Sequence, residues 1–218
     1  MVNLEIKLRN LQFSKEEQNL ATGAYTREAL RDRFQKALAT KPPFTLTTTV
    51  SIDESVLKRM ISKYSEQLIY QPLNEIRFWF EYSSGVFVEP GYPPLFYAKN
   101  RVKSLSPNKS AVAAIGEGIA GFVAQRLYRC RKLARPNHDY PDIVMDAGRR
   151  TYLVESKATI DTSDSRIREE IDEAIPRFVS FASTCSQLDV RPVVALLVGT
   201  LVVSESVYRS FVSEITMV

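Results

Sequence analysis

Cysteine, histidine and long apolar runs are all scarce in this sequence of 218 residues, and each shortage excludes a class of protein. The two cysteines, Cys130 and Cys185, cannot build a disulfide framework, and they fit a reduced intracellular protein. With His138 as the only histidine, the chain lacks the closely spaced histidines and cysteines of a structural zinc site. The longest apolar run covers residues 193–203, and it is far shorter than the ~20 residues that span a bilayer.

Glycine and proline are scarce as well, at 8 and 11 residues, which excludes collagen-like and low-complexity chains. Hydrophobic residues make up 44% of the chain, enough to build a packed core and too many for a disordered protein. The first ten residues, MVNLEIKLRN, lack the apolar stretch of a signal peptide, so we expect a cytoplasmic protein that does not bind membranes. A net charge of +4 permits a nucleic-acid partner without requiring one.

Hydrophobic periodicity and capping residues predict alternating helices and strands along the whole chain. The predicted helices cover residues 14–39, 53–70, 109–133, 165–184 and 204–215; the predicted strands cover 44–52, 75–82, 85–89, 95–102, 140–145, 150–157 and 191–199. A polar, proline-containing stretch at residues 104–110 is the best candidate boundary. We therefore expect an N-terminal α+β region over residues 1–105 and an α/β core over residues 106–218.

The segment most informative about chemistry is YPDIVMDAGRRTYLVESKAT, residues 140–159. A two-residue turn at residues 147–148 would place Asp142 opposite Leu153 on the neighbouring strand. Because side chains alternate along a strand, Asp142 then shares one face with Glu155 and Lys157. Two carboxylates on an apolar strand repel each other unless a cation pairs with them, and oxygen ligands select Mg²⁺, Mn²⁺ or Ca²⁺ over zinc.

Pro141-Asp142, followed after twelve residues by Glu155-Ser156-Lys157, resembles the signature of the PD-(D/E)xK nuclease superfamily. The resemblance covers roughly residues 108–200, where the order helix, hairpin strands, helix, strand is similar to the family core. It implies a restriction-endonuclease-like fold, with a central mixed sheet flanked by helices. It also implies a magnesium-dependent DNA endonuclease of restriction or repair type, in which Mn²⁺ can substitute for Mg²⁺.

The resemblance also assigns roles to individual residues. Asp142 and Glu155 would ligate the metal ion, with the Ser156 carbonyl as a further ligand. Glu117, on the preceding helix, would ligate it directly or through water. Lys157 would orient or activate the attacking water and stabilise charge in the transition state.

Further expectations concern DNA and assembly. Arg126, Arg149 and Arg150 are candidate phosphate contacts, although turn and helix-end positions are also common places for arginine. The region 1–105 would contribute DNA recognition, dimerisation or both. Cutting both strands of a duplex with one site per chain calls for a two-fold homodimer.

Three alternatives remain open at this stage. The acidic and basic side chains can form cross-strand salt bridges on a solvated sheet face. The fold can also persist without catalysis, as a nucleic-acid-binding or assembly module. Finally, Gly116-x-Gly118-x-x-Gly121 matches a dinucleotide-binding fingerprint, which requires a strand over residues 111–115 and a turn at the glycines.

Overall fold

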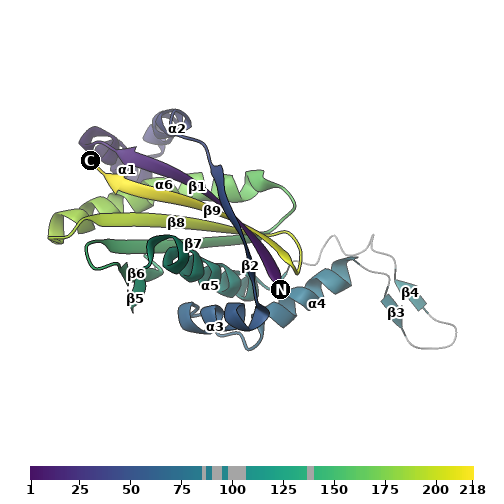
Figure 1. Ribbon diagram of the computed structural model, residues 1–218. Helices are drawn as coiled ribbons and strands as arrows, with labels where there is room; N and C mark the ends of the chain where they lie inside the picture. The colour runs from purple at the N-terminus through teal and green to yellow at the C-terminus, as the bar shows by residue number, and fades with distance from the viewer. Residues whose placement is uncertain (85–86, 90–94, 98–106, 137–139) are drawn as a thin grey trace.

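The computed structural model describes residues 1–84, 87–89, 95–97, 107–136 and 140–218 (Figure 1). Its helical segments are α1 (Lys15–Thr26), the 3₁₀ turn η1 (Glu28–Leu30), α2 (Arg31–Ala39), α3 (Glu54–Tyr64), α4 (Pro72–Ser84), α5 (Lys109–Tyr128) and α6 (Asp164–Leu188). Its strands are β1 (Val2–Phe13), β2 (Thr45–Ile52), β3 (Phe87–Glu89), β4 (Leu95–Tyr97), β5 (Arg131–Ala134), β6 (Ile143–Asp146), β7 (Thr151–Ile160), β8 (Val193–Val202) and β9 (Val207–Met217).

Seven strands form one mixed, curled sheet in the order β2-β1-β9-β8-β7-β6-β5, and β3 pairs only with β4. The pairs β1/β9 and β7/β8 are parallel, and the other neighbours in the large sheet are antiparallel. Strands β1 and β2 precede residue 105 and the other five follow it. Both parts of the chain that the sequence suggested therefore contribute to this sheet.

Helices cover both faces of the sheet, as Figure 1 shows. On one face α5 packs on β7 and β8, with α3 and α4 packed against α5. On the other face α6 packs on β8, and α1 and α2 pack against α6. Each face has its own apolar core, and alternate residues of β7 enter different cores: Val154 enters the α5 core and Leu153 the α6 core. The predicted α/β architecture with a central mixed sheet flanked by helices is confirmed.

The helix predicted over residues 14–39 is two helices, α1 and α2. The predicted capping box at its start is confirmed, because Ser14 and Glu17 exchange hydrogen bonds between side chain and backbone. The helix ends at Arg27, whose backbone is extended, and the chain reverses through η1. This reversal brings Phe34 of α2 into the same core as Ala24 of α1.

Two predicted elements have the wrong type. The strand expected over residues 75–82 is part of helix α4, which begins at Pro72 and buries Leu73 and Ile76 in the α5 core. The helix expected over residues 204–215 is strand β9, which lies between β1 and β8. A spacing of four residues, as between Tyr208 and Val212, satisfies both a helix and a strand. Only the neighbouring strands decide between them.

Two strands of the sheet were not predicted. β1 covers the first residues of the chain, and β5 occupies the end of the helix expected over residues 109–133. Helix α5 ends at Tyr128 because Arg129 adopts the left-handed conformation, with φ of 53°. Residues 85–86 and 98–102 of the expected strands, and residues 104–106 of the expected boundary, lie outside the described residues.

The three glycines of the dinucleotide-like pattern lie inside helix α5, and residues 111–115 are helical too. A Cβ atom at Gly116 would lie 2.5 Å from Cβ of Ala158 on β7. At Gly121 it would lie 2.2 Å from the ring of Tyr64 on α3. The glycines therefore allow α5 to pack closely between β7 and α3, and this part of the chain lacks the strand and turn of a pyrophosphate-binding fingerprint.

We expect Gly121→Ala to lower the free energy of unfolding by about 1–3 kcal/mol, because the fully buried Tyr64 ring cannot move aside. Gly23→Ala in α1 is the matched control, since the only close atom there is the end of the flexible Leu30 side chain. That replacement should cost little, because alanine favours a helix over glycine by about 1 kcal/mol. Urea unfolding measures both variants, and equal stabilities would contradict this account of α5 packing.

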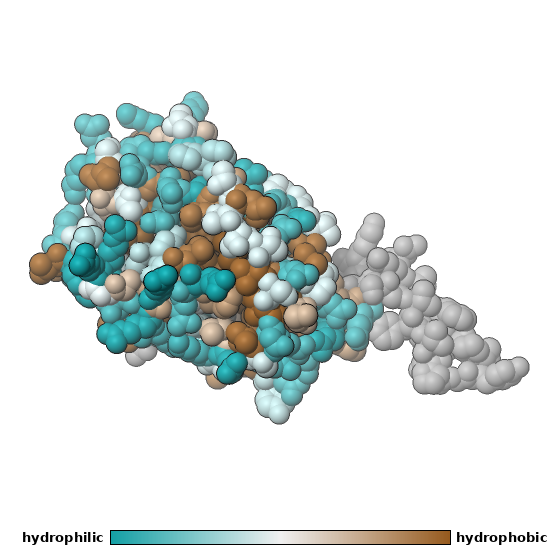
Figure 2. Space-filling model, in the orientation of Figure 1, coloured by the Kyte–Doolittle hydropathy of each residue, from teal (hydrophilic) through white to brown (hydrophobic). Residues whose placement is uncertain are grey.

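Hydrophilic residues cover most of the face seen in Figure 2, and a band of apolar residues runs through its middle. Within the described part of the chain, no helix has the length and hydrophobicity needed to cross a bilayer.

Candidate active site

The candidate site lies where β6 begins and separates from β7. The first pair of this ladder joins Ile143 to Val154, so the register places Asp142 level with Glu155. The sequence predicted a two-residue turn with Asp146 opposite Arg149, which is wrong because Asp146 pairs with Thr151. The shift is two residues, and an even shift leaves every side chain on its predicted face.

Hydrogen bonds connect the members of the predicted motif. Oδ2 of Asp142 accepts a 2.7 Å hydrogen bond from the backbone N–H of Ser156. Nζ of Lys157 donates a 2.7 Å hydrogen bond to Oε1 of Glu155. The structure therefore brings Asp142, Glu155 and Lys157 together, as the sequence predicted.

Burial separates this group from an ordinary surface ion pair. The Glu155 side chain is only 4% exposed, whereas that of Lys157 is 37% exposed. Oε2 of Glu155 is buried and has no hydrogen-bond partner among the described residues. An unpaired buried carboxylate oxygen is costly, so a solvated salt bridge on the sheet surface does not describe this site.

Both carboxyl groups have a raised pKa. Burial raises the pKa of Glu155 to about 7, with a further increase from the negative charge of Asp142 and a decrease from Lys157. Burial also raises the pKa of Asp142, and the charge of Glu117 adds to this effect. Burial and neighbouring negative charge both disfavour ionisation, and a bound cation would relieve both effects.

Glu117, predicted on the preceding helix, is buried in α5 beside this group. Its Oε2 accepts hydrogen bonds from Nη2 of Arg135 and from the backbone N–H of Glu66, each 2.9 Å long. Its Oε1 accepts a 3.0 Å hydrogen bond from the side chain of Gln67. Three donors therefore fix the carboxylate, and it acts on Asp142 through its charge.

Two side chains near the site were not recognised in the sequence. Arg135 follows β5, its side chain is only 11% exposed, and it bridges Glu117 and Glu66. The helix predicted over residues 109–133 does not place Arg135 after a strand, because β5 was not predicted. Tyr140 packs its ring against Phe178 of α6, and its hydroxyl is buried with no partner among the described residues.

The pKa of Tyr140 is raised, first by burial and then by the charge of Glu155. The tyrosine therefore lies close enough to the carboxylates for their charge to disfavour ionisation of its hydroxyl group. No local sequence pattern predicts that Tyr140 lies near the carboxylates, because its position depends on how the residues before β6 pack against α6.

The three predicted phosphate contacts lie toward the other end of the sheet. Arg149 and Arg150 are exposed in the turn before β7, six and five residues before Glu155, which corresponds to about 16–20 Å along the strand. Arg126 is exposed in the last turn of α5, about 13 Å along the helix from Glu117. The structure does not bring these arginines into the carboxylate site.

Among the described residues, no three histidine, cysteine, aspartate or glutamate side chains are grouped closely enough to hold a metal ion. The Asp142–Glu155 pair nevertheless fits a hard cation, since Oε2 of Glu155 lacks a partner. Magnesium typically uses one or two carboxylates and takes its remaining ligands from water and substrate phosphate.

Comparison with protein-family models, with curated proteins and with solved structures finds no match for this chain. The function of this site therefore has to be inferred from its residues alone.

Proposed function

We propose that this protein is a magnesium-dependent DNA endonuclease of the PD-(D/E)xK type, with its active site at Asp142, Glu155 and Lys157. The observation that carries the proposal is the buried, partnerless Oε2 of Glu155 beside Asp142 and Lys157. A buried glutamate beside a partly buried aspartate, both with a raised pKa, and one lysine are costly for structure alone, and the group suits metal-assisted hydrolysis.

The order of elements supports a restriction-endonuclease-like core. Helix α5 precedes the antiparallel strands β5, β6 and β7, and α6 then leads to β8, parallel to β7. This sequence of helix, hairpin strands, helix and strand is the order that the resemblance implies. Asp142 lies directly before β6, and Glu155 and Lys157 lie within β7, which supports the proposal.

Asp142 and Glu155 would hold Mg²⁺ or Mn²⁺, which when bound polarises the phosphodiester and lowers the pKa of a water. Asp142 is oriented for this role by the Ser156 N–H. Lys157, partly exposed at the mouth of the site, would orient the attacking water and stabilise negative charge on the phosphate. Glu117, held by its three donors, would act through a water molecule.

The remaining parts of the proposal concern the substrate and the assembly. A DNA strand running along β7 toward Arg149 and Arg150 would pass about five or six phosphates, since DNA advances about 3.4 Å per nucleotide. These arginines would then bind the DNA backbone away from the scissile bond. Two copies of the chain would cut the two strands of a duplex, in the cytoplasm, where the free thiols Cys130 and Cys185 stay reduced.

A nuclease assay tests the proposal directly. We expect the full chain to cleave plasmid or linear DNA in the presence of Mg²⁺ or Mn²⁺ and to leave it intact in EDTA. RNA of the same sequence is the second substrate, and its preferential cleavage would reassign the substrate class. If no DNA or RNA is cut and neither metal binds in calorimetry, the catalytic assignment is wrong.

A nucleic-acid-binding module without catalysis is the second candidate. It is favoured by the absence of a three-residue metal group among the described residues. Binding of DNA that is independent of divalent metals, without any cleavage, would be its signature.

A further inference from the structure

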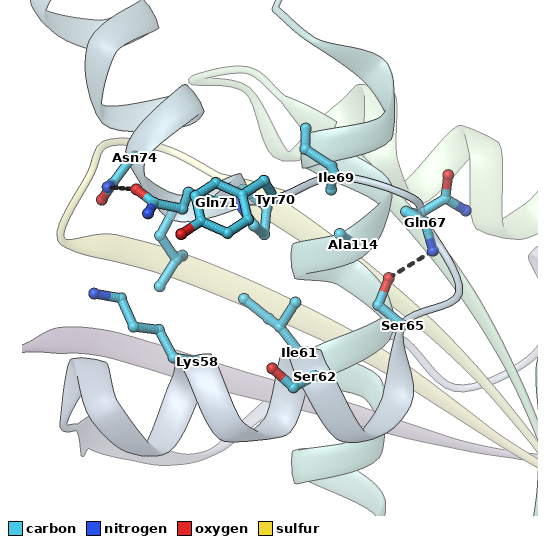
Figure 3. A pocket seen from close by; sticks show the side chains of 12 residues that line it. Lys58, Ile61, Ser62, Ser65, Gln67, Ile69, Tyr70, Gln71, Asn74 and Ala114 are labelled. Atoms are coloured by element: carbon cyan, nitrogen blue, oxygen red, sulfur yellow. Dashed lines mark hydrogen bonds between the residues drawn. The ribbon is translucent and has the colours of Figure 1, made fainter.

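A pocket of about 350 Å³ lies on the α5 side of the sheet, between helices α3 and α4 and the segment that joins them (Figure 3). Ile61, Leu73 and Ala114 give it an apolar base. Its volume lies within the roughly 300–1,000 Å³ typical of small-ligand sites. The pocket is therefore large enough for one planar group of a ligand.

The rim of the pocket is polar and mostly uncharged. Gln71 and Asn74 lie on one side, where the Asn74 amide donates to Oε1 of Gln71. That bond leaves the Gln71 amide N–H₂ and the Asn74 carbonyl oxygen as a donor and an acceptor. Lys58 lies across the pocket, where its Nζ pairs with Oε1 of Glu54 at 2.8 Å, and no carboxylate is among the described residues that line the pocket.

Tyr70 provides an aromatic surface at the pocket. The residue is 93% exposed, so a face of its ring is accessible to a ligand. A planar partner could stack on this ring, and every nucleobase has such a face. The neighbouring amides match the donor and acceptor edge of a base.

One segment connects the pocket to the candidate site. Gln67 lines the pocket and its side chain donates to Oε1 of Glu117. The adjacent backbone N–H of Glu66 donates to the other oxygen of the same carboxylate. An occupant of the pocket would therefore lie beside Gln67, which is one of the three donors that orient Glu117.

We propose that this pocket binds an unpaired base of the strand on which the nuclease acts. The base would stack on Tyr70, and its edge would bond to Gln71 and Asn74. The inference rests on the proposed function, which it deepens by assigning a substrate with an unpaired nucleotide near the scissile bond.

Fluorescence anisotropy with a labelled single-stranded DNA oligonucleotide, in EDTA so that no strand is cut, tests the pocket separately from catalysis. Tyr70→Ala should weaken binding by about 5- to 150-fold, the effect of losing one base–aromatic stack. Tyr70→Phe should retain the affinity because the ring remains. Asn74→Ala should weaken binding as well, and a fully paired duplex should be insensitive to all three changes.

Leu68→Ala is the matched control, because Leu68 is fully exposed on the same segment but does not line the pocket. Equal binding by wild type and Tyr70→Ala, or an equal loss in Leu68→Ala, would overturn the inference. Displacement of the strand by equimolar adenosine monophosphate would also overturn it, by assigning the pocket to a free nucleotide. If DNA is cleaved but Tyr70→Ala binds the oligonucleotide normally, only the proposal of base binding in the pocket is wrong. If Tyr70→Ala weakens binding but no DNA is cleaved, only the proposal of nuclease activity is wrong.

Discussion

Replacing Lys157 with alanine is expected to lower the rate of metal-dependent DNA cleavage by at least about 100-fold, the usual effect of removing a group that stabilises developing charge. Nζ of Lys157 is held 2.7 Å from Oε1 of Glu155, at the open side of a site whose other carboxylate oxygen is buried. No other cation among the described residues contacts that carboxylate. Asp142→Ala should cause a loss of similar size, measured as initial rates at saturating Mg²⁺.

Lys41→Ala is the matched control for this prediction. Lys41 also pairs with a glutamate, Glu17, but on the α1 side of the sheet and away from the candidate site. Its replacement should leave the cleavage rate unchanged. Cleavage that persists in both Lys157→Ala and Asp142→Ala would show that the site has been wrongly assigned.

Replacing Glu155 with glutamine should remove a pH-dependent loss of stability of about 3 kcal/mol. In the folded protein the Glu155 pKa is about 7, above its usual value of 4.5, so the native state holds this proton more tightly than the unfolded chain. The tighter binding of this proton therefore stabilises the folded wild-type protein fully below about pH 4.5, and this stabilisation is lost as the pH rises through about 7. The difference of about 2.5 pKa units corresponds to about 3 kcal/mol.

Glutamine is neutral at every pH, so the free energy of unfolding of Glu155→Gln should not show this loss. Unfolding of both proteins is measured at pH 4.5 and at pH 8 in EDTA. Between these two pH values, the stability of the variant relative to wild type should increase. Glu169→Gln on the exposed face of α6 is the control, and its profile should run parallel to that of wild type. Adding Mg²⁺ at pH 8 should stabilise wild type and not Glu155→Gln, since a ligand stabilises only the state that binds it. Parallel profiles for Glu155→Gln and wild type would contradict the burial of a charged carboxylate.

The common placement of the three central candidate residues was predictable because it depends on local geometry. Asp142, Glu155 and Lys157 lie on two adjacent strands joined by a short turn, and alternation along each strand fixes their common face. Even the wrong turn length preserved that face, since the register moved by two residues. Arg135 and Gln67, by contrast, reach Glu117 from elements whose positions no local pattern specifies.

The sequence by itself determined the alternating faces of β7, the strand β8 and the capping box of α1, because these depend on neighbours within a few residues. Tertiary structure alone decided that residues 207–217 form a strand, since a four-residue apolar spacing fits both periods until β1 and β8 offer hydrogen bonds. It also decided the chemistry of the candidate site. A glutamate on a solvated strand has an ordinary pKa. The pKa of Glu155 is raised because helices packed on both faces of the sheet bury it next to Asp142.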